Sequence, residues 1–137
     1  MRILIADDDR VLVTELAAHL KTFGFEVGVA YDALAASTEV VRTPPDAIVL
    51  DIGMPAGTGM AVLRRLRNSS KSAFVPVVVI TGKEDPELEG AVRSEGAADF
   101  FQKPLDFDRL RAVLYQLIGT ALVARCGLDA QGRRMNR

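Results

Sequence analysis

The sequence predicts an α/β fold in which a parallel β-sheet lies between two layers of helices. Five short apolar runs, rich in β-branched residues, alternate with segments of helical periodicity, so the order is strand then helix, repeated five times. The starts of the runs are about 20 to 30 residues apart, which is the length of one βα unit. Three runs are almost continuously apolar, as is typical of strands covered on both faces. Alternating βα units of this kind form a parallel sheet with helices on its faces.

The expected strands occupy residues 3–6, 25–30, 47–50, 75–80 and 100–101, of which the last is the weakest. Four apolar stripes at helical spacing lie between or after them, beginning at Leu12, Met60, Leu88 and Leu110. Asp85 and Pro86 are typical of the cap and first residue of a helix. Asp106 can cap the last helix and Gly127 can end it, so this helix is expected to cover residues 107–126.

Composition limits the class of protein. A chain of 137 residues, with 49% hydrophobic and 26% charged residues, is expected to form one folded domain. Its net charge of -1 removes the simplest case for direct nucleic-acid binding, which would show a basic excess. The single cysteine, Cys126, cannot form an internal disulfide, and no apolar stretch approaches the roughly 20 residues of a membrane span. These features predict a cytoplasmic protein that is not attached to a membrane.

Reactive side chains follow four of the expected strands. Asp7 and Asp8 come after the first, Asp51 after the third, Thr81 after the fourth and Lys103 after the fifth. Ligands of open parallel sheets bind outside the carboxyl ends of the strands, where these residues would meet. Taken singly, each is more simply explained as a turn or a helix cap. Their arrival at one edge of the sheet favours a functional site.

The charges of these residues indicate a divalent cation. Asp7, Asp8 and Asp51 carry three negative charges, which a divalent ion and Lys103 together would neutralise. A small set of carboxylates that leaves room for water and phosphate suits Mg²⁺, or alternatively Mn²⁺. Asp51 would then be able to act as a nucleophile and form an aspartyl phosphate. The ion and Lys103 would stabilise the transferring phosphoryl oxygens, and Thr81 would donate a hydrogen bond to one of them.

These residues carry a resemblance to a known family. The segments ILIADDD (3–9), IVLDIGMP (48–55), VVITG (78–82) and FQKP (101–104) resemble the receiver domain of two-component response regulators in order and spacing. The resemblance implies a flavodoxin-like, doubly wound sheet of five parallel strands in the order 2-1-3-4-5, with five helices in a three-layer sandwich. It assigns residues 1–120 to the receiver domain and leaves residues 121–137 as a helix extension and a flexible basic tail.

The resemblance also implies roles for residues of the site. Asp51 matches the phosphoacceptor, which takes a phosphoryl group from a sensor histidine kinase or a histidine phosphotransfer protein. Asp8 matches a direct Mg²⁺ ligand, Asp7 an acid that acts largely through water, and the Gly53 backbone carbonyl a further ligand. Lys103 matches the lysine that contacts phosphate, before a cis peptide bond to Pro104. Such a protein is a signalling switch that catalyses only its own phosphorylation and dephosphorylation.

Two further pairs of residues match regulatory positions of the family. Thr81 and Phe100 match the switch residues, although tyrosine is frequent where Phe100 stands. Gly53 and Lys83 match the positions that tune the rate of dephosphorylation. The responsive face in this family comprises the fourth helix, the fifth strand and the fifth helix, so Leu88, Val92, Phe100, Leu105 and the outer side of the last helix are expected to form or border it. This face would bind a downstream protein or form a homodimer.

Two other classes of protein are alternatives to this interpretation. An aspartate-nucleophile phosphohydrolase needs a second carboxylate two residues after the nucleophile, where this chain has Gly53. A pseudo-receiver, which binds partners without using phosphate, usually lacks part of the acidic set that is complete here. P-loop and Rossmann nucleotide sites require glycine motifs that the sequence does not contain.

Overall fold

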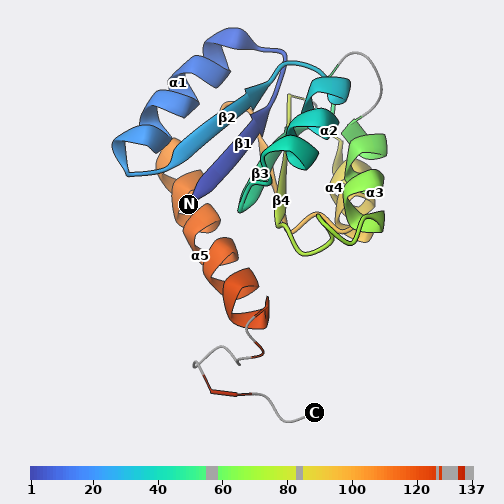
Figure 1. Cartoon of the computed structure of the whole chain (residues 1–137). Helices are drawn as coiled ribbons and strands as arrows, with labels where there is room; N and C mark the ends of the chain where they lie inside the picture. The colour runs from blue at the N-terminus through green and yellow to red at the C-terminus, as the bar shows by residue number, and fades with distance from the viewer. Residues whose placement is uncertain (55–58, 83–84, 126, 128–132, 135–137) are drawn as a thin grey trace.

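A computed structural model places the expected strands and helices in alternating order (Figure 1). It describes the whole chain except residues 55–58, 83–84, 126, 128–132 and 135–137. The elements are β1 (Arg2–Ala6), α1 (Arg10–Thr22), β2 (Glu26–Ala30), α2 (Ala33–Arg42), β3 (Ala47–Asp51), α3 (Gly59–Asn68), β4 (Val77–Thr81), α4 (Pro86–Ser94), β5 (Asp99–Gln102) and α5 (Phe107–Arg125).

The five strands form one parallel sheet in the order β2-β1-β3-β4-β5. This confirms the predicted flavodoxin-like topology. Every residue of β3 and β4 is buried, which explains why their sequences AIVLD and VVVIT show no alternation between apolar and polar residues. Asp51 is the last residue of β3 and Thr81 the last of β4, so both lie at the carboxyl edge of the sheet.

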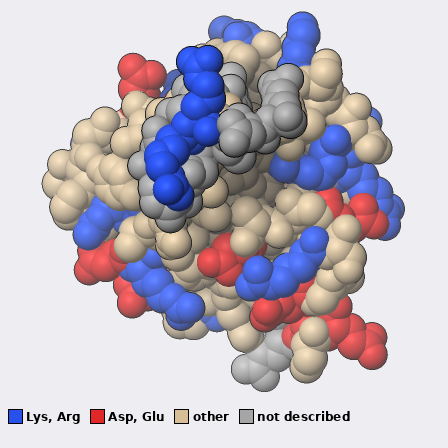
Figure 2. Space-filling model, turned by 90° about the horizontal axis from the view of Figure 1, so that it is seen from below, with Lys and Arg blue, Asp and Glu red and all other residues tan. Residues whose placement is uncertain are grey.

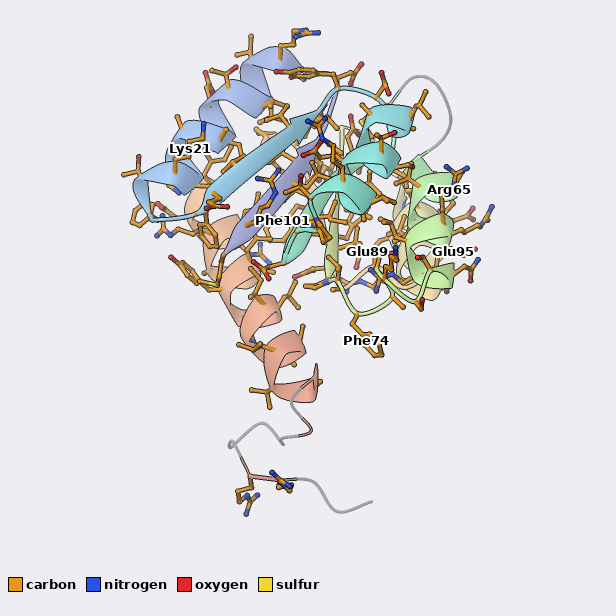
Figure 3. All side chains as sticks on the ribbon, viewed as in Figure 1. Lys21, Arg65, Phe74, Glu89, Glu95 and Phe101 are labelled. Atoms are coloured by element: carbon orange, nitrogen blue, oxygen red, sulfur yellow. The ribbon has the colours of Figure 1, made fainter. Side chains whose placement is uncertain are left out.

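Helices cover the two faces of the sheet in separate layers (Figure 1). One hydrophobic core joins α1 and α5 to the sheet through residues such as Leu16 and Leu114. The other core joins α2, α3 and α4 to the opposite face, with Leu63 and Val92 at its centre. Figure 3 shows the charged side chains of Lys21 and Arg65 on the outer sides of α1 and α3, as expected for amphipathic surface helices.

The strands β2 and β4 begin later than predicted, and each for a local reason. Phe25 lies outside β2, because its N–H donates to Leu20 O and closes the end of α1. β4 begins at Val77, since the Val75 N–H is used in a turn with Ser72 O. The last helix is described to Arg125, and Cys126 lies outside the described residues.

Helix α2 corresponds to none of the four apolar stripes. Its buried residues are Ala33, Ala36 and Val40, and two of these are too small to stand out in the sequence. The N-terminus of the helix is nevertheless stabilised by a cap, because the Asp32 side chain accepts a hydrogen bond of 2.7 Å from the Ala35 N–H. This is the usual role of an aspartate at a helix N-cap.

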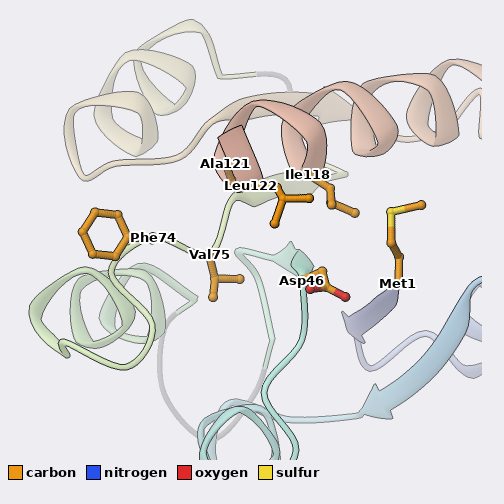
Figure 4. A pocket seen from close by; sticks show the side chains of 7 residues that line it. All are labelled: Met1, Asp46, Phe74, Val75, Ile118, Ala121 and Leu122. Carbon is orange, nitrogen blue, oxygen red and sulfur yellow. The ribbon is translucent and has the colours of Figure 1, made fainter. Parts of the chain in front are cut away.

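A small groove lies at the amino edge of the sheet, opposite the ends that carry Asp51 and Thr81. It has a volume of about 100 Å³ and is lined by Met1, Asp46, Phe74, Val75, Ile118, Ala121 and Leu122 (Figure 4). Its single ionisable side chain, Asp46, accepts a hydrogen bond from the Arg2 N–H. Acidic and basic side chains are interspersed on the side of the molecule seen from below (Figure 2).

Among the helices of the described residues, none has both the length and the apolar content that a membrane span requires.

Candidate functional site

Four strand ends converge on an acidic pocket at the carboxyl edge of the sheet. Carboxylate oxygens of Asp7, Asp8 and Asp51 all lie within 4.8 Å of one another. Asp7 and Asp51 are buried, whereas Asp8 is exposed at the mouth of the pocket. Lys103 follows β5 directly and places its ammonium group beside the two buried carboxylates. The structure therefore brings together residues that are up to 96 positions apart in the sequence.

Lys103 joins the two buried acids. Its Nζ lies 2.8 Å from Asp7 Oδ2 and 3.5 Å from Asp51 Oδ2. The Lys103 N–H also donates to Thr81 O at 2.8 Å, which ties the end of β5 to the end of β4. The peptide bond between Lys103 and Pro104 is cis. With the backbone held at this point, the lysine side chain points back into the pocket.

The other oxygens of the buried carboxylates are held by the backbone. Asp7 Oδ1 accepts a hydrogen bond of 2.9 Å from the Asp9 N–H. Asp51 Oδ1 accepts one of 3.0 Å from the Gly53 N–H. Asp9 in turn caps α1, because its side chain accepts from the Leu12 N–H. Each buried carboxylate is therefore held by a backbone N–H two residues further along the chain, in the loop that follows its strand.

The electrostatics of the pocket leave negative charge uncompensated. Burial raises the pKa of Asp7 above its ordinary value; the contact with Lys103 and the Asp9 N–H oppose this effect, and the charge of Asp51 adds to it. For Lys103, burial lowers the pKa, but the contact with Asp7 and the charges of Asp51 and Asp7 outweigh burial and raise it. One ammonium group thus faces three carboxylates.

The donor set fits a small divalent cation. Asp7 Oδ2 is buried and accepts no aligned hydrogen bond from the described residues beyond its ion pair with Lys103. An oxygen in this position is available as a ligand or as an acceptor from a metal-bound water. Carboxylate oxygens with an open, exposed side at Asp8 are what Mg²⁺ requires, since it keeps several waters.

Of the other predicted residues, Thr81 and Gly53 lie at the carboxyl ends of β4 and β3, and Phe100 lies within β5. Thr81 is buried at the end of β4. Gly53 is exposed, and a Cβ added to it would meet only Asp51 Oδ1, at an ordinary 3.6 Å. Phe100 is half-buried and packs against the core under α2, α3 and α4. Lys83 lies outside the described residues.

A groove of about 300 Å³ runs beside the pocket between the start of α1 and the segment that leads into α5. It is lined by Asp9, Val11, Leu12, Glu15, Lys103, Pro104, Leu105 and Phe107. Val11 is 69% exposed, a high value for an aliphatic side chain next to a buried charged site. Lys103 and Pro104 link this groove to the predicted site, and Leu105, which was expected on the responsive face, lines it as well. The sequence did not indicate Val11 or Leu12 as part of a surface.

Comparison with known proteins identifies the family. The family model described as the response regulator receiver domain matches residues 3–115. The chain belongs to this family. This receiver domain is 34% identical over 118 residues to the response regulator MprA of Mycobacterium avium, a match covering 86% of the chain and 51% of MprA. It is 37% identical over 142 residues to the response regulator PleD of Caulobacter vibrioides, covering 98% of the chain and 30% of PleD.

Solved structures agree with these matches. The BeF3-activated N-terminal receiver domain of RstA from Klebsiella pneumoniae superposes with a TM-score of 0.79 at 27% identity, covering 86% of this chain and 98% of that one. This receiver domain spans about half the length of MprA and less than a third of PleD.

Proposed function

We propose that this receiver domain accepts a phosphoryl group on Asp51 from a phosphohistidine, supplied by a sensor histidine kinase or a histidine phosphotransfer protein. The observation that carries the proposal is the position of the Asp51 carboxylate, which lies in one acidic cluster with Asp7 and Asp8 and 3.5 Å from Lys103. A carboxylate so placed can attack phosphorus while opposite charges screen the approach of the phosphate.

In the transfer, an Asp51 oxygen forms the new bond to phosphorus and the bond from phosphorus to the donor imidazole nitrogen breaks. The electron pair of that bond leaves with the imidazole. Lys103 neutralises charge on the phosphoryl oxygens from the side of β5. Asp7, Asp8, Asp51 and the Gly53 carbonyl would hold Mg²⁺ or Mn²⁺, which when bound supplies a positive charge to the oxygens of the transferring group.

The groove beside Lys103 supports docking of a protein donor. Its apolar side chains, with Val11 exposed, offer a surface for an apolar helix whose phosphohistidine would then reach the pocket. Val11→Asp is expected to slow phosphorylation by a donor protein while leaving phosphorylation by acetyl phosphate unchanged. Leu34→Asp, on α2, is a matched control because Leu34 is 68% exposed on the opposite layer. Equal rates for Val11→Asp and the control with a protein donor would contradict docking in this groove.

Phosphorylation would bias the face made by α4, β5 and α5. The modified Asp51 gains negative charge and acceptor oxygens, to which Thr81 at the end of the next strand would donate. Phe100 borders the proposed face from β5, and Leu88 packs half-buried from α4. Val92 is completely buried, so it supports this face from within. The altered face would then bind a downstream protein or a second copy of the chain, and Gly53 and Lys83 would set how long the phosphorylated form lasts.

The direct test is incubation with acetyl phosphate and Mg²⁺, followed by intact-mass measurement. A gain of one phosphoryl group is expected in the native chain and in Asp46→Asn, and none in Asp51→Asn. Asp46 is a suitable control because it lies at the opposite edge of the sheet. Absence of modification in the native chain with acetyl phosphate and with a phosphorylated histidine donor would refute the proposal and favour a pseudo-receiver.

A further inference from the structure

A stacked pair of side chains lies next to the acidic pocket but outside it. The guanidinium group of Arg10 lies over the ring of Tyr31, 3.9 Å from its centroid. Arg10 is the first residue of α1, and Tyr31 directly follows β2. We infer that this pair is a positioning device for the carboxylates of the loop between β1 and α1, and that it strengthens the binding of the divalent ion. The inference rests on the proposed function of that pocket.

The loop is tied to the end of β2 at both of its ends. At one end, the Asp7 N–H donates to Ala30 O at 3.0 Å. At the other end, Arg10 stacks on Tyr31, the residue after Ala30. Asp8 therefore lies in a short segment whose two ends are anchored on consecutive residues, the last residue of β2 and the residue after it. The helix cap made by Asp9 adds a third restraint from the side of α1.

These restraints matter because the carboxylates repel one another. Asp8 is exposed, so a loose loop would let its side chain turn away from Asp7 and Asp51 when no cation is bound. Ion binding would then have to bring it back and order the loop. A loop already held in place avoids that cost, which is the general benefit of preorganisation. The stacked pair can be removed without touching any of the three acids and without removing a charge, since Tyr31 is neutral.

The charge of Arg10 and its contact with Tyr31 have opposite effects on cation binding. A positive charge near the pocket weakens the attraction for a cation, so removal of Arg10 alone mixes two influences. Substitution of Tyr31 changes the contact and leaves every charge in place. A cation–π contact at a partly exposed site corresponds to about a two- to five-fold change in an equilibrium constant.

The test is the Mg²⁺ dissociation constant, measured by titration calorimetry without any phosphoryl donor. Tyr31→Leu is expected to weaken Mg²⁺ binding by about two- to five-fold, and Tyr31→Phe, which keeps the ring under Arg10, to bind as the native chain does. Tyr115→Leu is a matched control, since Tyr115 is the other tyrosine of the chain and packs its ring on Phe25, outside the acidic pocket. This control should lower thermal stability without changing Mg²⁺ affinity.

A double-mutant cycle completes the test. In an Arg10→Met background, Tyr31→Leu should cause no further loss of Mg²⁺ affinity, because the contact is already gone. Native affinity in Tyr31→Leu, or the same loss with and without Arg10, would overturn the positioning role while leaving the proposed function intact. Failure of the native chain to bind Mg²⁺ at all would overturn both.

Discussion

Gly59 provides the sharpest test of the packing behind the phosphoacceptor strand. A Cβ at this position would lie 2.5 Å from Ile52 Cα and 2.8 Å from Asp51 O, distances at which atoms must move apart. Both neighbours are backbone atoms of the segment that holds Asp51, and the Gly59 N–H donates to Ile52 O at 3.2 Å. Because both close atoms belong to the backbone, no rotation of a side chain can relieve the clash.

Gly59→Ala has two opposing effects on the free energy of unfolding: helix propensity raises it, and overpacking lowers it. Gly59 is the first residue of α3, and on helix propensity alone alanine would stabilise it by up to about 1 kcal/mol. Overpacking typically costs about 1 to 3 kcal/mol, and contacts with backbone place this site at the upper end. The net expectation is a loss of about 2 kcal/mol, or a fall of about 6 to 8 °C in Tm for a chain of this size.

Urea and thermal unfolding of the purified chain measure this loss. Gly90→Ala in α4 is the matched control, because an added Cβ there has nothing within 4 Å, and it should stabilise by about 0.5 to 1 kcal/mol. Amide resonances of Asp51 and Ile52 should shift in Gly59→Ala and stay in place in Gly90→Ala. If Gly59→Ala is as stable as the native chain, the close approach of α3 to β3 described here is wrong.

Three further outcomes are expected. Burial raises the pKa of Asp7 in the folded state; the charge of Asp51 adds to this effect, and Lys103 offsets it only in part. The folded chain therefore binds the Asp7 proton more tightly than the unfolded chain does, so ionisation of Asp7 lowers the stability of the fold above the folded pKa. Without metal, Asp7→Asn should therefore raise Tm at pH 7, and the gain should shrink as the pH falls from the raised folded pKa of Asp7 to its unfolded pKa of about 4; a gain independent of pH would contradict this cause. Mg²⁺ at 100 times its dissociation constant should stabilise the native chain by about 2.7 kcal/mol in thermal unfolding, with most of the gain lost in Asp51→Asn. Val92→Ala, which removes the one completely buried side chain of α4, should cost about 1 to 2 kcal/mol and accelerate amide exchange in α4 more than in α5; equal exchange in both helices would show that α4 is held by other contacts.

The sheet and the acidic pocket could be predicted because their signals are local. The apolar runs of β3 and β4 end abruptly at Asp51 and Thr81, and parallel strands bring such ends to one edge. Strand β5 is harder to predict from the sequence, since only Phe100 and Phe101 of its four residues are apolar and it lies at the edge of the sheet. Its existence followed from the repeated βα order more than from its own residues.

Contacts between distant segments could not be predicted from the sequence. The Arg10 stack on Tyr31 depends on how β1 and β2 lie side by side. Arg67 likewise donates to Ala73 O, while its aliphatic part fills the space that a Cβ of Gly96 would occupy. Only the fold shows that this arginine is half-buried and that burial lowers its pKa.

The edge strand β5 has a consequence for how a change at the pocket spreads through the molecule. Phe100 and Phe101 are neighbours in the chain, yet Phe100 packs with the core beneath α2, α3 and α4, and Phe101 is buried in the core beneath α1 and α5. A rotation of Phe100 can therefore disturb one layer while Phe101 keeps the strand anchored in the other. We therefore expect a rotation of Phe100 to disturb the core beneath α2, α3 and α4 more than the core that contains Phe101.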